Sequence, residues 1–197
     1  MKELFLKLNK AKQKKIVEAG VEEFSKQLFN DASINQIIKK AGIARGSFYL
    51  YFDDKLDFYC YLMDTIFEKK TITFAIELFK SKQIDFLGFF RELFKFNLRL
   101  LTNDEHKRFF RNLYLGINKE VKEYLDQKRK KVRESLIQKA LDLIPEKLTA
   151  NMEQLNELII IIQLIQMDLF VKGIANNISN ETLLAVYDFR ISLLKIE

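Results

Sequence analysis

The stretch ARGSFY at residues 44–49 combines a cation, a small residue and hydroxyl groups at spacings that suit contact with DNA. Arg45 can donate two hydrogen bonds to the O6 and N7 atoms of guanine, or it can bind a phosphate. Ser47 can bond to a base edge or to a phosphate oxygen. Gly46 has no Cβ, so backbone and DNA can approach each other closely at this position. These residue types indicate a helix that reads DNA.

Aromatic and basic residues continue the pattern beyond this stretch. Tyr49 and Tyr51 carry hydroxyls that can reach the wall of a DNA groove, and Lys55 can reach a phosphate. Phe48 and Phe52 are four positions apart and share one helix face, which we expect to anchor the helix in the protein core. A DNA-facing side and a core-facing side are therefore both predicted within one short segment.

Three predicted helices position this segment, and they span residues 10–28, 34–41 and 45–51. Apolar residues recur at four-residue intervals from Ile16 to Leu28, which predicts the first of these helices. Ser33 and Gln36 have the spacing of a capping box and predict the start of the second, and Gly42 predicts its end. Two short helices joined by such a tight turn are typical of a helix-turn-helix.

The rest of the chain is predicted to be helical as well, because one proline and six glycines leave few turn residues. The further helices are expected at residues 55–80, 84–101, 104–116, 118–144, 152–172 and 181–195. Pro145 and Gly173 are predicted to end two of them, and Asn180 is predicted to cap the last. The fold class is therefore all-α, with a helix-turn-helix domain at 1–52 and a larger C-terminal helical domain at 53–197.

The composition excludes several functional classes. Cys60 is the only cysteine and His106 the only histidine, so an intrachain disulfide, a Cys-rich zinc site and a two-His metal site are excluded. No Gly-rich phosphate loop and no paired acidic signature stands out, so we expect neither an enzyme nor a metal or cofactor. We place Cys60 in the core and His106 on the surface, at the start of a helix.

No segment is predicted to direct the chain to a membrane. The N-terminus lacks the apolar run of a signal peptide. The most apolar stretch, Leu158–Val171, is short and contains Gln163, Gln166 and Asp168. We therefore expect a cytoplasmic protein without a membrane partner. The net charge of +6 is compatible with a nucleic-acid partner but does not require one.

Two segments of the chain are strongly basic, and the first of them has two interpretations. Residues 1–15 contain six lysines and one glutamate, and are either an arm that follows the phosphates or a solvated start of a helix. The run Lys128–Arg133 is predicted to be a solvent-exposed face of a long helix.

The segment AGIARGSFYLYFDDK, residues 41–55, resembles the N-terminal domain of TetR-family transcriptional regulators. It matches the pattern A-G-x-x-x-G-x-x-Y-x-Y-F-x-x-K at every defined position, and the resemblance extends over about residues 10–56. It implies a homodimer that binds double-stranded operator DNA and releases it when a small molecule enters the C-terminal domain. The DNA-contacting positions that it implies are Ser33, Arg45, Gly46, Ser47, Tyr49, Tyr51 and Lys55. One departure is Ala44, where such proteins usually have a serine that caps the third helix.

The predicted C-terminal domain has wide apolar helix faces that contain isolated polar residues. On helix 84–101 the apolar arc is about 200° wide and rich in phenylalanine, with Asn97 at its middle. Asn97 must be hydrogen-bonded, either to the chain itself or to a ligand. We expect a small, apolar or aromatic effector between these helices. The candidate pocket residues are Met63, Phe67, Phe90, Phe94, Asn97, Phe110, Tyr114, Gln163 and Met167.

The helix at 152–172 has an even wider apolar arc, of about 260°. Such a helix is either the central helix of a larger core or is buried on one side by a partner subunit. We expect a homodimer through the last two helices, with Ile162, Leu169, Leu183 and Val186 in the interface. The protein is then a regulator, most simply a repressor, that an effector releases from a palindromic operator. The alternative is a DNA-binding regulator or architectural protein without an effector.

Overall fold

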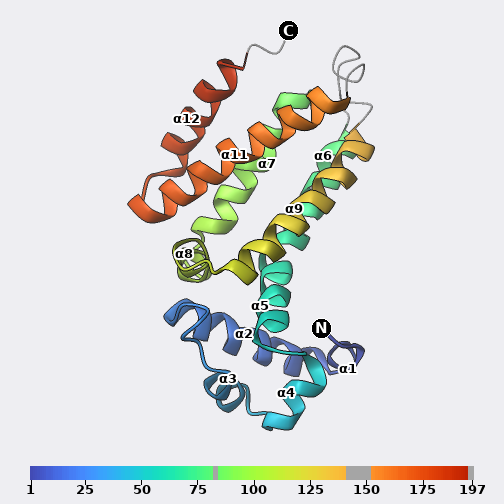
Figure 1. Cartoon of the computed structure of the whole chain (residues 1–197), viewed down its shortest axis with the longest axis vertical. Helices are drawn as coiled ribbons and strands as arrows, with labels where there is room; N and C mark the ends of the chain where they lie inside the picture. The colour runs from blue at the N-terminus through green and yellow to red at the C-terminus, as the bar shows by residue number, and fades with distance from the viewer. Residues whose placement is uncertain (82–83, 141–151, 195–197) are drawn as a thin grey trace. The chain divides into compact units, whose positions relative to one another are not determined.

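The computed structural model describes residues 1–81, 84–140 and 152–194, and this part of the chain contains helices and no strand (Figure 1). The helices are α1 (Glu3–Leu6), α2 (Lys10–Lys26), α3 (Ile34–Ala41), α4 (Arg45–Tyr51), α5 (Lys55–Met63), α6 (Lys69–Ser81), α7 (Phe86–Thr102), α8 (Lys107–Leu115), α9 (Lys119–Ala140), α11 (Met152–Asn176) and α12 (Asn180–Ser192). The all-α fold class is therefore confirmed. The predicted helix end at Pro145 lies outside the described residues.

The chain forms two compact units, and each is described by itself. Unit 1 consists of residues 1–69 and 104–125, and unit 2 of residues 70–103 and 126–197. The boundary predicted at residue 52 separates the DNA-binding part from the rest of the chain by function. The compact unit 1 is larger than this part, because it also includes α5 and α8. The division at residue 52 remains a prediction.

Unit 1 is organised around α2, which packs against α3, α5 and α8. Aromatic side chains fill its core, and Phe24 lies 4.6 Å from Tyr59 and 6.4 Å from Phe109 between ring centroids. Gly20 allows α5 to approach α2 closely, since a Cβ at this position would lie 2.5 Å from the ring of Phe58. Cys60 is buried in this core, as predicted.

The start of α3 differs from the prediction. Ser33 is the N-cap residue, but its side chain makes no capping hydrogen bond, so the capping box with Gln36 was wrong. Instead, the carboxylate of Glu23 on α2 accepts a hydrogen bond of 2.8 Å from the backbone N–H of Ser33. A carboxylate near a helix N-terminus is also favoured by the helix dipole. The packing of α2 on α3 therefore supplies a partner that local spacing did not reveal.

The predicted helix 55–80 is interrupted by one π-helical segment, Asp64–Glu68, which lies between α5 and α6. Such segments insert an extra residue into a helical turn and are often found at functional positions. The hydroxyl of Tyr124 on α9 donates a 2.9 Å hydrogen bond to the carboxylate of Asp64. Burial, together with the adjacent negative charge of Asp64, raises the pKa of Tyr124 above its ordinary value.

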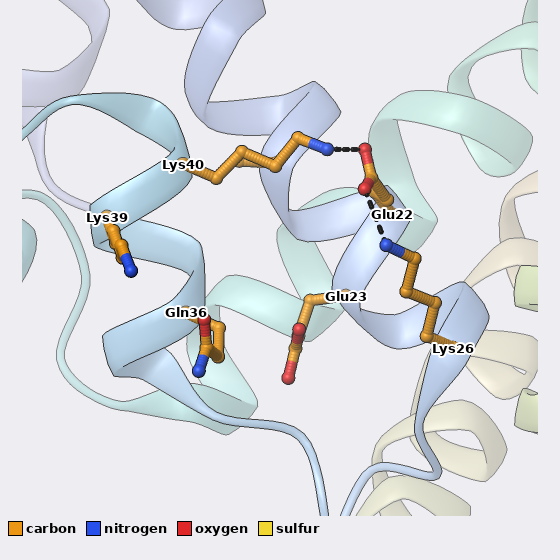
Figure 2. Close-up of a pocket in the computed structure, with 7 residues that line it drawn as sticks. Glu22, Glu23, Lys26, Gln36, Lys39 and Lys40 are labelled. Atoms are coloured by element: carbon orange, nitrogen blue, oxygen red, sulfur yellow. Dashed lines mark hydrogen bonds and ion pairs between the residues drawn. The ribbon is translucent and has the colours of Figure 1, made fainter.

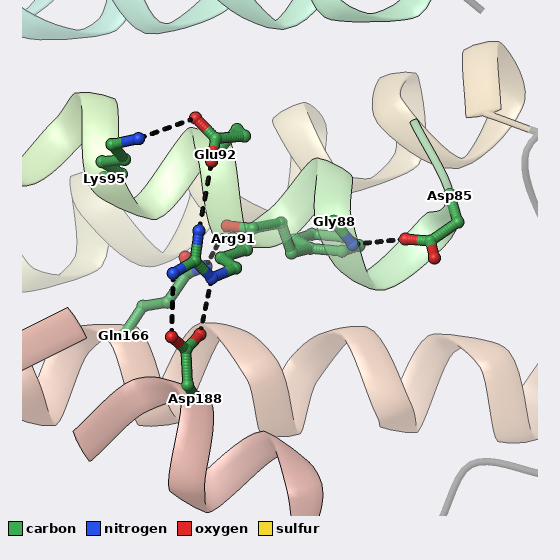
Figure 3. A network of polar contacts seen from close by, with 8 residues as sticks. Asp85, Gly88, Arg91, Glu92, Lys95, Gln166 and Asp188 are labelled. Atoms are coloured by element: carbon green, nitrogen blue, oxygen red, sulfur yellow. Dashed lines mark hydrogen bonds and ion pairs between the residues drawn. The ribbon is translucent and has the colours of Figure 1, made fainter. Parts of the chain in front are cut away.

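Unit 2 is built by α7, α11 and α12. Phe94 on α7 is fully buried, with its ring centroid 5.1 Å from that of Phe170 and 4.6 Å from that of Tyr187. Arg91 and Asp188 join α7 to α12 through two hydrogen bonds of 2.7 and 2.9 Å (Figure 3). Bidentate pairs of this kind add geometric specificity to the attraction, and so fix the register of the two helices.

Two predicted helix ends in unit 2 were wrong. The helix α11 continues through Gly173 to Asn176, and Asn177 has the positive φ of 53° that ends it. Gly173 is instead a point of close packing, because a Cβ there would lie 2.5 Å from Leu183. The side chain of Ser179, rather than that of Asn180, caps α12 by accepting from the N–H of Thr182.

Two other expectations concern exposure. His106 was predicted at the surface, but this N-cap residue of α8 is buried by the packing of unit 1, with 8% of its surface exposed. Lys130 and Lys131 in the basic run are exposed, as predicted, whereas the side chains of Arg129, Val132 and Arg133 lie outside the described ones.

Helix α11 is long and apolar enough to cross a membrane by length and composition. Within unit 2 it packs against α7 and α12, and Leu155, Ile159 and Ile162 are buried there. The core helix of a soluble protein has the same length and composition. Packing within unit 2 therefore uses one part of its apolar surface and leaves residues such as Ile161 and Leu164 exposed.

Candidate nucleic-acid interface

Helices α3 and α4 form the predicted helix-turn-helix, with the predicted bounds. Gly42 ends α3 in the left-handed region, with φ 67°, and the N–H of Ile43 bonds to the carbonyl of Ile38. This is the geometry in which glycine is preferred because it has no Cβ. The turn leads directly into α4, which has no side-chain cap because its N-cap residue is Ala44.

The exposed face of α4 consists of Arg45, Gly46, Tyr49 and Leu50. Phe48 and Tyr51 are buried on the opposite face, and Ser47 is half-buried. Three of the predicted DNA-contacting residues, Arg45, Gly46 and Tyr49, therefore lie together on the surface. The structure places Tyr51 apart from them, with 5% of its surface exposed and its ring 5.9 Å from that of Phe5.

Sequence reasoning missed two residues of this surface. The amide oxygen of Asn35, exposed on α3, accepts a hydrogen bond from the guanidinium of Arg45. The same guanidinium lies 5.8 Å from the ring centroid of Tyr49, within the range of a cation–π contact. Leu50 is 57% exposed beside Tyr49. The helical periodicity of residues 45–51 could have identified Leu50, but nothing local pointed to Asn35.

The ammonium of Lys55 was expected to be available for a DNA phosphate, but it is hydrogen-bonded within the protein. Its ammonium donates hydrogen bonds of 3.0 and 3.1 Å to the carbonyl oxygens of Asn30 and Ala32. It also lies 4.9 Å from the ring centroid of Phe29. Lys55 thus ties the start of α5 to the turn between α2 and α3, and its contact with phosphate remains a prediction.

A charged hollow lies between α2 and α3 (Figure 2). Glu22 on α2 accepts from both Lys26 and Lys40. Lys39 is exposed on α3 and makes no ion pair with the other residues drawn in Figure 2. The helix before the turn therefore carries positive charge, as expected for an element that crosses a DNA backbone.

The predicted effector residues are divided between the two units. In unit 1, Met63 and Phe110 are buried, while Phe67 and Tyr114 are half-buried. The rings of Phe67 and Phe110 are in edge contact at 5.5 Å. The members in unit 2 are Phe90, Phe94 and Asn97, which are buried, and Gln163 and Met167, which are half-buried.

Several of the polar and aromatic residues in unit 2 have partners in the chain itself. The hydroxyl of Thr71 donates a 2.7 Å hydrogen bond to the amide oxygen of Asn97. Of the two partners expected for Asn97, the chain itself or a ligand, the chain therefore supplies one. The amide of the buried Gln166 donates to the carbonyl of Phe90 (Figure 3). The rings of Phe74 and Phe96 stack at 4.2 Å. Packing of the chain on itself accounts for much of the wide apolar arc.

Unit 2 also contains a hollow of about 470 Å³ between the start of α7 and the end of α12. Its lining residues are Asp85, Leu87, Gly88, Arg91, Tyr187, Asp188, Ile191 and Ser192. None of the predicted effector residues is among them.

The predicted dimer residues are mostly unavailable to a partner. Ile162, Leu169 and Leu183 are only 0, 2 and 1% exposed, because α7, α11 and α12 bury them within unit 2, and Val186 is half-buried. The large apolar residues that α11 leaves exposed are instead Met152, Ile161 and Leu164, and those at the end of α12 are Phe189 and the C-cap residue Leu193. Arg190 on α12 donates a 2.6 Å hydrogen bond to Asp168 on α11, and Ile161, Leu164, Phe189 and Leu193 lie within seven positions of this pair along their helices. We call these last four residues the exposed α11–α12 face.

The fold and the exposed face of α4 define a helix-turn-helix protein with an additional helical domain. Residues 16–59 match the bacterial regulatory proteins of the tetR family, and residues 85–196 match the Tetracyclin repressor-like C-terminal domain. The chain therefore belongs to the TetR family of transcriptional regulators. Regulators of this family are DNA-binding proteins and not enzymes, in agreement with the expectation from the sequence that this protein is not an enzyme.

Individual relatives agree with this assignment. The uncharacterised HTH-type regulator YvdT of Bacillus subtilis is 47% identical over 49 residues, which are 25% of each chain. The uncharacterised HTH-type regulator YdgC of the same organism is 46% identical over 43 residues, or 22% of each chain. This chain thus matches about a quarter of the length of these curated relatives.

Solved structures show the same fold over most of the chain. A TetR-family regulator from Syntrophomonas wolfei has a TM-score of 0.72 at 20% identity, and the alignment covers 94% of this chain and 96% of that one. NalD, described as the secondary repressor of the MexAB-OprM multidrug efflux pump in Pseudomonas aeruginosa, has a TM-score of 0.62 at 19% identity. That alignment covers 91% of this chain and 96% of NalD.

Proposed function

We propose that the protein is a cytoplasmic repressor that binds a pseudo-palindromic operator as a homodimer, and that a small, largely apolar effector releases it. The main support for DNA binding is the exposed face of α4, which presents Arg45, Tyr49 and Leu50. The helix before it, α3, is positively charged. A helix of this kind enters the major groove, where base edges can be distinguished.

The exposed side chains support different contacts. Arg45 is oriented by Asn35 and Tyr49, which reduces the conformational entropy that its guanidinium loses on binding a guanine. Leu50 is apolar and exposed, and suits contact with the methyl group of a thymine. Ser33, Ser47 and Lys55 are the candidates for contact with the phosphate backbone of the DNA.

The first test uses an operator selected by the wild-type protein from a pool of random duplexes. Arg45→Ala and Leu50→Ala are expected to relax base preference, each at its own position, because a lost base contact costs about 1–3 kcal/mol. Repeating the selection with each variant measures this change. If both variants select the wild-type sequence with unchanged preference, α4 does not read bases.

The variant Lys55→Ala distinguishes two roles of Lys55, a direct contact with a phosphate and stabilisation of the turn before α3. A direct phosphate contact would lower the slope of log affinity against log salt by about 1. If Lys55 acts by holding the turn before α3, affinity is expected to fall without a change in that slope. The carbonyl contacts of Lys55 favour the second result.

The effector part of the proposal is supported by the match to the Tetracyclin repressor-like C-terminal domain and by the aromatic character of unit 2. The alternative, a regulator without an effector, is favoured by the extensive packing of these rings on each other. A thermal-shift screen with apolar and aromatic compounds distinguishes the two. An effector must weaken operator binding by the same factor by which operator weakens the binding of the compound. A panel in which no compound raises the melting temperature would support the alternative.

A further inference from the structure

Helix α4 cannot be stable by itself. It has seven residues, whereas isolated helices shorter than about 12–15 residues are marginal in water. Its N-cap residue, Ala44, provides no side-chain hydrogen bond. Its last carbonyl groups have no partner within the helix and need donors from elsewhere. The order of the recognition helix therefore depends on contacts with other parts of unit 1.

Lys2 supplies donors to the C-terminal end of α4. Its backbone N–H donates a 2.8 Å hydrogen bond to the carbonyl of Tyr51, and its ammonium donates one of 2.8 Å to the carbonyl of Tyr49. The ammonium also lies 2.9 Å from the carboxylate of Asp53. This hydrogen-bonded cation holds the pKa of Asp53 below its ordinary value. One residue thus satisfies two carbonyls of the last turn of α4.

The position of Lys2 is fixed by α1, a short helix that the sequence patterns did not predict. Phe5 on α1 is fully buried, and its ring centroid lies 4.9 Å from that of Phe52 and 5.1 Å from that of Tyr61. The amide of Gln13 on α2 donates to the carbonyls of Phe5, Leu6 and Leu8, at 3.2, 3.1 and 2.8 Å. Gln13 is itself buried, so the end of α1 is held by a desolvated amide.

We propose that residues 1–8 clamp the recognition helix, and that Lys2 and Gln13 are positioning residues that set how well the protein distinguishes its operator from other DNA. This inference rests on the proposed DNA-binding function. The clamp holds the last turn of α4, which carries the exposed Tyr49 and Leu50. Base contacts need these side chains in one arrangement, so fixing them in advance reduces the conformational entropy that is lost on specific binding. Phosphate contacts on other DNA do not depend on that arrangement.

The clamp differs from a basic arm that follows the phosphates. The ammonium of Lys2 is bonded to Tyr49 and Asp53, which restricts it as a phosphate ligand. Lys7, the C-cap residue of α1, is exposed, and its ammonium lies 3.6 Å from the carboxylate of Glu3 rather than near α4 carbonyls. Lys7 therefore provides a matched control for the loss of one positive charge.

The test compares Lys2→Met, Lys2→Arg and Gln13→Leu with the control Lys7→Met in the full chain. Affinity is measured over a salt series for the selected operator and for a scrambled duplex of equal length. Relative to the control, Lys2→Met and Gln13→Leu are expected to lower operator affinity about fivefold, the size of one lost hydrogen bond, while affinity for the scrambled duplex is unchanged. Lys2→Arg, which retains a charged donor, is expected to keep wild-type discrimination.

Three outcomes would overturn the clamp, two of them in DNA binding and one in hydrogen exchange. An equal loss on both duplexes, with the salt slope lower by about 1, would make Lys2 a phosphate contact. An unchanged ratio of the two affinities in both Lys2→Met and Gln13→Leu would remove any positioning role. Hydrogen exchange of the amides of residues 49–52 in the free protein gives a readout that does not depend on DNA. Faster exchange in Lys2→Met than in Lys7→Met is expected even if no duplex is preferred, and equal exchange would refute the clamp.

Discussion

Leu164→Glu is expected to convert a dimer into a folded monomer and to weaken operator binding by about 100-fold or more. Leu164 is 63% exposed on α11, so the protomer can accommodate the charge. In a two-fold dimer through the exposed α11–α12 face, the carboxylate would be buried twice without a partner, at a cost of several kcal/mol. A monomer reads only one half-site, and the gain from joining two binding events is then lost.

The matched control for this change is Leu115→Glu. Leu115 is 52% exposed on α8 in unit 1, and it does not belong to the exposed α11–α12 face. It is expected to remain dimeric in analytical ultracentrifugation, with operator affinity close to that of the wild type. Phe189→Glu on α12 should behave like Leu164→Glu, because Phe189 is 64% exposed and is one of the residues we propose for the same interface. If both variants of the face sediment as dimers, the subunits associate elsewhere.

Gly20→Ala is expected to lower the melting temperature by several degrees, whereas Gly46→Ala is expected to preserve stability and reduce operator affinity. A Cβ on Gly20 would lie 2.5 Å from the ring of Phe58 and 2.8 Å from Leu62. Both neighbours are fully buried, so they cannot move aside easily. Overpacking of this kind costs about 1–3 kcal/mol, and each kcal/mol shifts the melting temperature of a chain this long by about 2–4 °C.

Gly46 provides the opposite case. A Cβ at this position meets no atom within 4 Å, and alanine favours helix over glycine by up to about 1 kcal/mol. Stability should therefore be unchanged or slightly higher. On the exposed face of α4, however, the methyl group would stand between backbone and DNA, and we expect at least a tenfold loss of operator affinity. Thermal unfolding and operator titration of the same preparations check both parts. Wild-type binding by Gly46→Ala would mean that DNA does not approach α4 at this position.

The sequence by itself determined the local elements of the DNA-binding half. Helices α3 and α4 have the predicted bounds, because Gly42 provides a left-handed turn that other residues rarely adopt. Arg45, Gly46 and Tyr49 could be assigned to one surface because positions 45, 46 and 49 fall on one side of a helix. Local periodicity and turn chemistry are properties of neighbouring residues, and so a single sequence contains them.

Tertiary packing decided which partner each polar group has. The N–H of Ser33 is satisfied by Glu23, and the carbonyls at the end of α4 by Lys2, although no local spacing relates these residues. Lys55 has the position of a phosphate ligand in the sequence pattern, but its ammonium reaches the carbonyl of Asn30. Donors and acceptors that are distant in sequence become neighbours only when the helices pack, and the desolvated groups then bond to whichever partner lies within reach.

Only the tertiary structure decided which side of an apolar helix faces the core. The wide apolar arc of α11 made Ile162 and Leu164 equivalent in the sequence, yet Ile162 is fully buried and Leu164 is 63% exposed. Likewise, Gly173 has the appearance of a helix terminator but is a contact point for Leu183. The hydrophobic effect favours burial of any apolar surface without direction, so the arrangement of α7, α11 and α12 determines which of these residues remain for a partner.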